Sequence, residues 1–401
     1  MTETEKYLNF YFGHSHFRGD QKEIIETIIS GRDTLIIMPT GGGKSLCYQL
    51  PALILPGLAL VISPLIALMK DQVDKLHRYG IKADFINSSL QKEEIQEKFE
   101  KIKRNEIKIL YIAPERIQSR FFLDILRKIK VSLIAVDEAH CISQWGYNFR
   151  PDYMKLKELI YFSKKPPVIA LTATATLEVR KDIINKLGLK KPLIKISGFD
   201  RENFIYEIKK VKSNREKDEI LWDFLCEDPG CGIIYTGTRK GTEILAEKLK
   251  SWGIKAEHYH GGMDKHKRED IQNKFMQNHM DLIVSTSAFG MGVDKPDIPF
   301  IIHYTLPGSL EEYYQETGRA GRDNKGARAI LLFRPADIDL RKNLIKKKNL
   351  SKNKERELEK LYNLMEYIKS PDCRKKFILS YFGEYRKNYL CNSCDNCSRY
   401  V

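Results

Sequence analysis

The sequence lacks an N-terminal secretion signal and an unbroken membrane-spanning run. Residues 1–6 are mostly polar or charged, without the apolar segment that a signal peptide needs. The residues from Leu50 to Met69 carry no charge and match the length of a membrane helix. Prolines and a glycine divide them, however, so we expect a helix end, a short strand at Leu58–Ile62 and a loop. We therefore predict a globular chain that is not inserted in a membrane.

Acidic residues are too few to balance the basic ones, and cysteines are sparse outside one C-terminal group. There are 53 Asp and Glu against 68 Lys and Arg, which gives a net charge of +15 and a pI near 9.2. This excess favours a polyanionic partner, nucleic acid before a membrane. Four of the eight cysteines are scattered, which excludes a secreted disulfide framework. We expect a reducing, cytoplasmic location, at the nucleoid if the source is bacterial.

A glycine-rich loop is the stretch around which the rest of the chain is organised. The apolar run from Leu35 to Met38 leads into Pro-Thr-Gly-Gly-Gly-Lys-Ser at residues 39–45. Backbone N–H groups of such a loop cradle phosphates, the lysine reaches the β- and γ-phosphates, and the serine hydroxyl holds Mg²⁺. The alternative is a glycine-rich turn with an incidental lysine. The predicted nucleotide-binding residues are Thr40, Gly41, Gly43, Lys44 and Ser45.

Short apolar runs alternate with amphipathic stretches in two successive series. The predicted strands of the first series after the loop are Leu58–Ile62, Ile107–Ile112, Val131–Val136 and Val168–Leu171. Those of the second series are Gly232–Tyr235, Lys255–Tyr259, Leu282–Ser285, Phe300–His303 and Ala329–Phe333. The alternation predicts an α/β fold of doubly wound parallel sheets, which bind ligands beyond the carboxyl ends of their strands.

We expect three domains. Residues 1–198 and 199–335 would form two doubly wound domains that flank a cleft, although no sequence repeat relates them. From residue 336 the strand pattern stops, and a charged helical stretch leads to the C-terminal cysteines, so residues 336–401 would form a small helical domain. The basic residues between Arg341 and Lys354 could assist nucleic-acid binding, but a solvated helix face explains them equally well.

Two adjacent carboxylates, Asp137 and Glu138, follow the predicted strand Val131–Val136. In a sheet that also carries a phosphate loop, Asp137 is placed to bind the Mg²⁺ of a nucleotide. Glu138 is placed to activate the attacking water. An acidic pair alone could also cap a helix, and the loop upstream is what favours catalysis.

Several motifs together resemble known helicases. Three stretches resemble motifs of superfamily 2: Asp-Glu-Ala-His at 137–140, Ala-Leu-Thr-Ala-Thr-Ala-Thr at 170–176 and Gln-Glu-Thr-Gly-Arg-Ala-Gly-Arg at 315–322. The form Pro-Thr-Gly-x-Gly-Lys-Ser is also the helicase form of the phosphate loop. Stretches similar to the RecQ-type DNA helicases lie at 17–21, 141–153, 288–294 and around the terminal cysteines. The resemblance extends over nearly the whole chain and implies two RecA-like domains.

The resemblance implies how ATP would be recognised. Gln21, with Arg18 near it, matches a motif that reads the edge of adenine. His14 stands where a ring could stack on the base, and a surface histidine is the alternative. Asp294 matches a residue on the ribose side.

The resemblance also implies how hydrolysis would produce motion. Arg319 and Arg322 match a pair that crosses the cleft to the γ-phosphate, where such arginines raise the rate by roughly 10³–10⁵. Because they lie in the second predicted domain, hydrolysis would require the cleft to close. His140, Thr172 and Thr174 match a relay between the ATP site and DNA.

For nucleic acid, the aromatic-rich loop offers Trp145, Phe149 and Arg150. Aromatic faces stack on bases at about 1–3 kcal/mol each whatever the sequence, and arginine adds phosphate pairing. The polar neighbours disfavour the alternative that both aromatics belong to the core. The family has His-Asp where this chain has Tyr147 and Asn148, which leaves open how tightly DNA binding triggers hydrolysis. Positions that match contacts to the DNA backbone are Ser63, with the nearby Lys70, Arg239, Ser285 and Thr286.

Four cysteines near the C-terminus have the spacing of a metal site. Cys391, Cys394 and Cys397 are each separated by two residues, and Cys373 lies upstream of them. Four thiolates suit tetrahedral Zn²⁺ and leave no open position, so the zinc would be structural. Free or redox-active thiols are the alternative. The residues around the cysteines resemble the RecQ zinc module.

By resemblance the chain would be an ATP-dependent helicase that moves 3′ to 5′ on single-stranded DNA and unwinds duplex DNA in recombination or repair. Expected partners are single-stranded and forked DNA, and a single-stranded-DNA-binding protein or other repair factors, with the chain acting as a monomer. The rival functions are a DNA-stimulated translocase that needs another domain to unwind, an RNA helicase and an inactive DNA-binding scaffold. Family members commonly continue into a winged-helix domain, and the sequence up to Val401 shows no part of such a domain. Whether Val401 is the natural C-terminus stays open.

Overall fold

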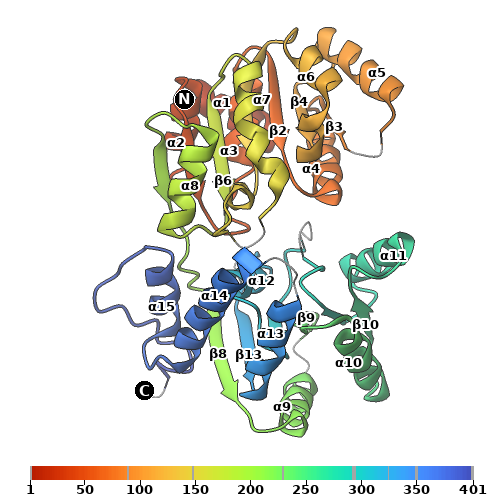
Figure 1. The fold of residues 1–401 in the computed structure, drawn as a ribbon, viewed down its shortest axis with the longest axis vertical. Helices are drawn as coiled ribbons and strands as arrows, with labels where there is room; N and C mark the ends of the chain where they lie inside the picture. Colours follow the sequence, from red (N-terminus) through yellow and green to blue (C-terminus); the bar gives the residue numbers. More distant parts are fainter. Residues whose placement is uncertain are drawn as a thin grey trace. The chain divides into compact units, whose positions relative to one another are not determined.

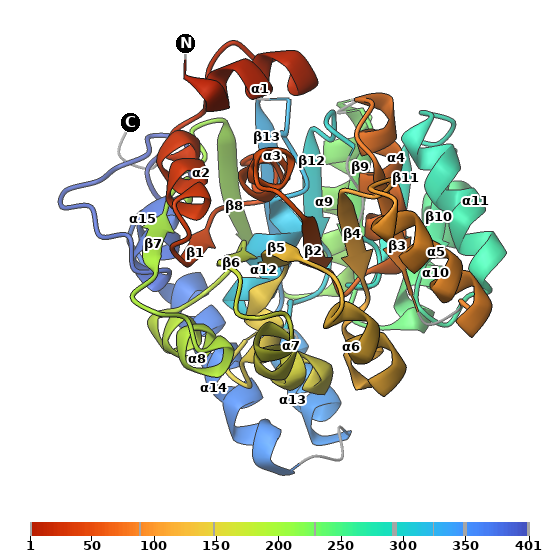
Figure 2. The same ribbon diagram turned by 90° about the horizontal axis from the view of Figure 1, so that it is seen from above.

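The computed structural model describes residues 2–87, 90–146, 149–227, 230–290, 295–323, 325–347 and 351–398. The chain divides into two compact units, Met1–Gly198 and Phe199–Val401. Each unit is built on a parallel sheet flanked by helices (Figures 1 and 2).

The sheet of the first unit has the strand order β3-β4-β2-β5-β6-β1-β7 in the described residues, and all of these pairings are parallel. Its strands are β1 (Thr34–Ile37), β2 (Leu58–Ile62), β3 (Ala83–Ile86), β4 (Ile109–Ile112), β5 (Val131–Val136), β6 (Val168–Thr172) and β7 (Leu193–Ile196). Strands β1, β2, β4 and β6 are buried along their whole length. Continuous apolar runs such as theirs are typical of parallel strands covered on both faces.

Helices of the first unit precede and connect these strands. They are α1 (Glu3–Phe12), α2 (Gln21–Ile29), α3 (Leu46–Ile54), α4 (Ile66–Arg78), α5 (Lys92–Lys103), α6 (Arg120–Leu126), α7 (Leu156–Phe162) and α8 (Leu177–Leu187), with 3₁₀ turns η1 (Pro114–Gln118), η2 (Ala139–Ile142) and η3 (Pro151–Lys155). The end of α3 and strand β2 divide the charge-free stretch as predicted, but the predicted loop is short, because α4 already begins at Ile66. Among the described residues, no helix is both long and apolar enough to cross a membrane.

The sheet of the second unit has the strand order β10-β11-β9-β12-β13-β8, again with parallel pairings. Its strands are β8 (Phe204–Lys210), β9 (Gly232–Tyr235), β10 (Ala256–Tyr259), β11 (Leu282–Ser285), β12 (Phe300–His303) and β13 (Ala327–Phe333). Its helices are α9 (Asn214–Cys226), α10 (Arg239–Ser251), α11 (Lys265–Met276), α12 (Leu310–Thr317), α13 (Ala336–Lys347), α14 (Ser351–Lys369) and α15 (Arg374–Tyr381).

The C-terminal helices pack onto the second sheet's unit rather than standing apart. Helix α14 contacts α12, α13 and α15, and the rings of Phe199 and Phe382 stack with centroids 4.7 Å apart. In Figure 1, α15 lies at the β8 end of this sheet, while α10 and α11 lie at the β10 end. The region that holds the cysteines therefore shares its buried surface with the second sheet.

Candidate nucleotide, nucleic-acid and zinc sites

The predicted phosphate loop connects β1 to α3 at the carboxyl end of the first sheet. Gly41 and Gly43 both have φ of +80°, a left-handed conformation that glycine adopts without strain. A Cβ atom on Gly42 would lie 2.8 Å from Cγ of Met38, so this position also favours glycine. Helix α3 begins directly after Ser45. Its N-terminal N–H groups follow the loop, an arrangement that binds anions.

The Lys44 side chain lies along this loop. Its Nζ donates hydrogen bonds to the carbonyl oxygens of Met38 (2.9 Å) and Pro39 (3.0 Å). The ammonium group therefore stands beside the glycines that would receive the phosphates. The loop and the lysine together fit a nucleotide phosphate chain.

Gln21, the first residue of α2, joins the predicted adenine motif to the loop. Its side chain is buried, its Oε1 accepts from the backbone N–H of Arg18 (2.9 Å), and its Nε2 donates to the carbonyl of Gly43 (3.3 Å). A Cβ on Gly43 would collide with Nε2 of Gln21, so a side chain at this position would displace the Gln21 amide. The side chains of Arg18 and His14 are exposed.

The acidic pair follows β5 at the same end of the sheet. Glu138 has φ of +47°, which is unusual for a residue with a side chain and costs of order 1–3 kcal/mol. Oδ1 of Asp137 accepts from the backbone N–H of Glu138 (2.9 Å). Burial, followed by the neighbouring Glu138 charge, raises the pKa of Asp137 to about 7, and the positive charge of Lys44 opposes this shift. The carboxylate is thus suited to a site where a cation offsets its buried charge.

A buried path of polar contacts leads away from Glu138. Nδ1 of His140 lies 3.2 Å from Oε2 of Glu138 and 2.8 Å from Oγ1 of Thr172. The Thr172 hydroxyl in turn accepts from the N–H of Thr174 (3.2 Å) and donates to its carbonyl (3.2 Å). The three residues of the predicted relay therefore lie together, connecting the end of β5 to the turn after β6.

Tyr153, on η3, is a member of this site to which the sequence reasoning gave no role. It is fully buried, and its hydroxyl donates to the backbone carbonyl of Asp137 (2.9 Å). Nearby, Nη1 of Arg150 donates to the carbonyl of Pro64 (2.8 Å). These bonds fix the C-terminal end of the predicted DNA loop to the carboxyl end of the sheet. The position of Tyr153 at the end of the aromatic-rich motif was the available signal.

In the second unit, the two predicted arginines have different surroundings. Arg319 is buried, and its Nη1 donates to the carbonyl of Gly290. Arg322 is partly exposed, and its Nε lies 3.5 Å from the carbonyl of Gly318. Asp294 lies outside the described residues.

The four C-terminal cysteines converge. Their Sγ atoms all lie within 4.8 Å of one another, and those of Cys391 and Cys397 are 3.9 Å apart. Zn–S bonds of about 2.3 Å in a tetrahedron place the sulfur atoms about 3.8 Å from each other. The cluster therefore fits a zinc ion coordinated by four thiolates.

Comparisons with known proteins match the same three regions. Models of the DEAD/DEAH box helicases, the helicase conserved C-terminal domain and RecQ zinc-binding match residues 18–183, 216–324 and 335–398. The ATP-dependent DNA helicase RecQ of Bacillus subtilis is 43% identical over 401 residues, covering 99% of this chain and 67% of that protein. The probable ATP-dependent DNA helicase RecS of the same organism is 44% identical over 353 residues, covering 88% of this chain and 71% of that protein. This chain belongs to the RecQ-type DNA helicases.

Solved structures agree on the fold. Dbp5 from S. cerevisiae, bound to RNA and ADP BeF3, has a TM-score of 0.66 at 16% identity, covering 96% of this chain and 93% of that one. This likeness shows two RecA-like folds and nothing more specific. The chain spans 61–67% of the length of three RecQ relatives. The RecQ zinc-binding match contains all four converging cysteines, so this cluster is the zinc site of the family.

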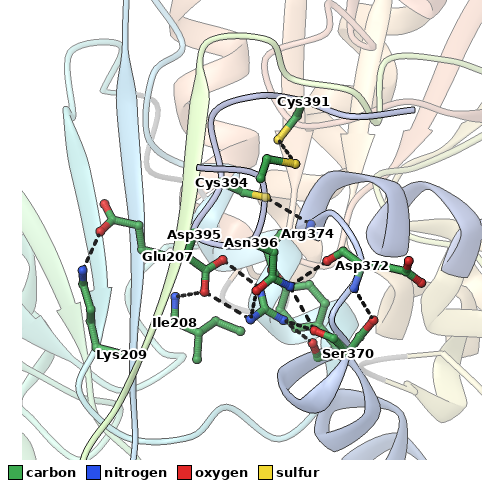
Figure 3. Close-up of polar contacts among 12 residues, drawn as sticks. Glu207, Ile208, Lys209, Ser370, Asp372, Arg374, Cys391, Cys394, Asp395 and Asn396 are labelled. Carbon is green, nitrogen blue, oxygen red and sulfur yellow. Dashed lines mark hydrogen bonds and ion pairs between the residues drawn. The ribbon is translucent and has the colours of Figure 1, made fainter. Parts of the chain in front are cut away.

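The zinc site of this RecQ chain is tied to the second sheet through Arg374, which directly follows Cys373 (Figure 3). The guanidinium is buried and contacts both carboxylate oxygens of Asp395, at 2.8 and 3.1 Å. Asp395 also accepts from the backbone N–H of Ile208 (3.2 Å), and its own N–H donates to the carbonyl of Tyr206 (3.1 Å). The cysteine loop therefore hydrogen-bonds directly to β8.

Further hydrogen bonds extend this network. The Arg374 guanidinium donates to the carbonyl of Tyr367 (2.6 Å), at the end of α14. The Asn396 amide donates to the carbonyls of Ser370 (2.9 Å) and Asp372 (2.7 Å). The loop between Cys394 and Cys397 is thereby joined to α14, α15 and β8 together.

The aromatic-rich loop of this RecQ chain places its predicted DNA residues at or near the surface. Trp145 is 39% exposed, and Phe149 and Arg150 are partly exposed. The N–H of Trp145 donates to Oγ of Ser143 (3.1 Å), which donates to Asp182 on α8 (2.7 Å). An exposed ring on an anchored loop is available for stacking. Tyr147 and Asn148 lie outside the described residues.

The other predicted DNA positions fall into two groups. Arg239, at the start of α10, is exposed, and Thr286 is partly exposed. Ser63 and Ser285 are buried, and the Ser285 hydroxyl donates to the carbonyl of Tyr259 (2.8 Å). We infer that the two serines would act by shaping their loops, whereas Arg239 and Thr286 could touch the DNA.

Proposed function

We propose that this RecQ-type chain hydrolyses ATP, moves 3′ to 5′ along single-stranded DNA and unwinds duplex DNA in recombination or repair. One observation carries the proposal most directly, the buried path from Glu138 through His140 and Thr172. A contact path between a catalytic carboxylate and a loop on the next strand is what a nucleic-acid-responsive ATPase needs. Occupancy of one end can then alter the geometry at the other.

In the first unit, we assign phosphate binding to Lys44 and the loop before it. Ser45 and Asp137 would hold Mg²⁺, which neutralises charge on the phosphates. Glu138 would orient and deprotonate the attacking water, held in place by its unusual backbone conformation and by His140.

The base of the nucleotide would lie near α2. Gln21 is fixed by Arg18 and Gly43, so its amide is preorganised next to the phosphate loop. The exposed side chains of Arg18 and His14 are available to cover the base. Asp294 is assigned to the ribose side on the resemblance alone.

From the second unit, we assign the γ-phosphate contact first to Arg322. The buried Arg319 is held by the carbonyl of Gly290, in the motif that leads to Asp294. Arg319 would therefore support that motif, whereas the partly exposed Arg322 can supply a guanidinium to a phosphate. Because these residues and Lys44 lie in different units, we propose that hydrolysis depends on the two units coming together.

Single-stranded DNA would bind through Trp145, Phe149 and Arg150 in the first unit and Arg239 and Thr286 in the second. Stacking and phosphate contacts of this kind ignore base sequence and weaken with salt. An RNA helicase shares the fold, but the aromatic-rich loop and the zinc site are RecQ features, which favours DNA.

The remaining assignments follow the same reasoning. We propose three functional regions, residues 1–198, 199–335 and 336–401, the last attached to the second sheet. We propose that the chain works as a monomer in the cytoplasm, on forked DNA, with a single-stranded-DNA-binding protein or another repair factor as partner. The principal rival is a translocase core that needs a further domain or partner to separate strands.

The test is strand displacement on duplexes with either a 3′ or a 5′ single-stranded tail, with ATP hydrolysis followed in the same reaction. We expect displacement from the 3′-tailed duplex only, and hydrolysis that rises with single-stranded DNA more than with RNA. Hydrolysis without displacement would favour the translocase. Displacement from the 5′ tail would contradict the proposed direction.

Matched variants test the assignment of roles. Lys44→Ala and Arg322→Ala should abolish hydrolysis while single-stranded DNA still binds. Lys92→Ala, at an exposed position on α5, is the control and should behave as the parent does. If both active-site variants lost DNA binding as well, the separation of ATP and DNA roles would be wrong.

A further inference from the structure

A second cluster of metal-ligating side chains lies in the second unit, away from the cysteines. His258 is on β10 and His260 directly follows it, so the two side chains point to the same face of the strand. Glu243 is on α10, which packs against β10. Strands β10 and β8 are at opposite ends of the strand order, and the zinc site contacts β8. The two clusters are therefore separate sites.

The three side chains already lie close to a coordinating arrangement. One ligand atom from each lies within 4.8 Å of the others, and Nε2 of His260 is 3.0 Å from Oε1 of Glu243. The two imidazoles are nearly parallel, at 20°, with ring centroids 5.6 Å apart. Bonds of about 2.0–2.1 Å to one ion need ligand atoms about 3.3–3.4 Å apart. A small rotation of the half-exposed Glu243 and of His258 would supply the contraction.

Unused nitrogen atoms distinguish this cluster from an ordinary Glu–His hydrogen bond. Nδ1 of both histidines is buried and has no hydrogen-bond partner in the described part of the chain. His260 as a whole is only 6% exposed. Buried polar atoms are nearly always paired, so an unpaired imidazole nitrogen on His258, next to the Glu243–His260 pair, points to a ligand.

We propose that Glu243, His258 and His260 bind one divalent transition-metal ion. Two imidazoles and a carboxylate suit Zn²⁺, Co²⁺ or Ni²⁺, whereas Mg²⁺ and Ca²⁺ prefer oxygen ligands. Three protein ligands leave a position for water, so this ion exchanges more readily than the zinc held by four thiolates. The occupied site links α10 to β10.

The experiment titrates Co²⁺ into the full chain whose cysteines already hold zinc, and follows the visible spectrum and the heat of binding. We expect the chain to bind one additional equivalent of Co²⁺. Its visible spectrum should show the d–d bands of nitrogen and oxygen ligation and no thiolate charge-transfer band. His258→Ala and Glu243→Gln should each weaken this binding, the first by more than about 100-fold. The control His279→Ala removes an exposed histidine outside the cluster and should change nothing.

Several outcomes would overturn the proposal. The proposal is wrong if the chain binds no additional equivalent of Co²⁺. It is also wrong if the His258→Ala and His279→Ala variants bind Co²⁺ with equal affinity. Thiolate charge transfer would place the Co²⁺ among the cysteines instead. Thermal unfolding without added metal shows whether His258→Ala is folded, and Glu243→Gln, at a half-exposed position, provides the second test.

Discussion

Replacing Asp395 by alanine should destabilise the second unit far more than its place in a C-terminal loop suggests. The substitution leaves the Arg374 guanidinium buried beneath the cysteine loop without its carboxylate. The side chains of Arg374 and Asp395 are only 3% and 12% exposed, so water cannot easily replace the lost partner. Asp395→Ala also removes the acceptor for the N–H of Ile208 on β8.

The expected magnitude follows from this burial. Removing one partner of a buried ion pair costs about 3–5 kcal/mol, because the other charge is left uncompensated. For a unit of about 200 residues, each kcal/mol lowers Tm by about 2–4 °C. Asp395→Ala should therefore lower Tm by about 6–20 °C. Asp395→Asn keeps a hydrogen-bond acceptor, so its Tm should fall by less.

The assay is thermal unfolding monitored by circular dichroism, with zinc content measured in the same preparation. Lys209→Ala is the control, since the Lys209 side chain on the same strand is 47% exposed and its partner Glu207 keeps a second ion pair with Arg328. An exposed lysine contributes little to stability, so this variant should unfold at the same temperature as the parent. If Asp395→Ala also unfolded at the same temperature as the parent, the view that Arg374 and Asp395 join the zinc site to the sheet would be wrong.

Three further variants test other parts of the molecule. Trp145→Ala should weaken single-stranded DNA binding by about 1–3 kcal/mol while nucleotide binding is unchanged, which fluorescence anisotropy measures; an unaltered affinity would contradict the stacking role. Thr172→Val should reduce the stimulation of ATP hydrolysis by DNA more than the basal rate, because it interrupts the path from Glu138; equal losses in both rates would indicate a merely structural hydroxyl. Cys394→Ser should yield insoluble or zinc-free protein, measured by solubility and metal content, and a soluble, fully active variant would argue against a structural zinc.

The apolar strands inside the two sheets could be predicted from the sequence because their signal is local. The strands Leu58–Ile62, Val131–Val136, Gly232–Tyr235 and Phe300–His303 have the predicted bounds. Strands β3, β7 and β8 were not predicted. In β8, apolar residues alternate with Glu207 and Lys209, and its pairing with β13 joins residues distant in sequence. A half-polar run of this kind is recognised as a strand only through such partners.

The residues of the candidate sites also fall into those that the sequence predicts and those that it does not. The spacing of the cysteines along the chain is enough to predict that they form one site, and their convergence in the structure confirms that prediction. The contact of Tyr153 with the carbonyl of Asp137 could not be predicted from its place at the end of the aromatic-rich motif, since a tyrosine near a motif is usually only a core residue. The surroundings of Arg319 and Arg322 also depend on tertiary packing, which two neighbouring arginines in a motif do not reveal.

The hydrogen bonds from the cysteine loop to β8 have a consequence for aggregation. Within the described strands β8 pairs only with β13, so its other side is the edge of the sheet. Asp395 occupies the N–H of Ile208 and the carbonyl of Tyr206 on that side. An uncovered edge is a template on which a second chain can add a strand. Loss of zinc would therefore free the cysteine loop and also expose the hydrogen-bonding edge of β8. Zinc-depleted molecules should then associate through β8.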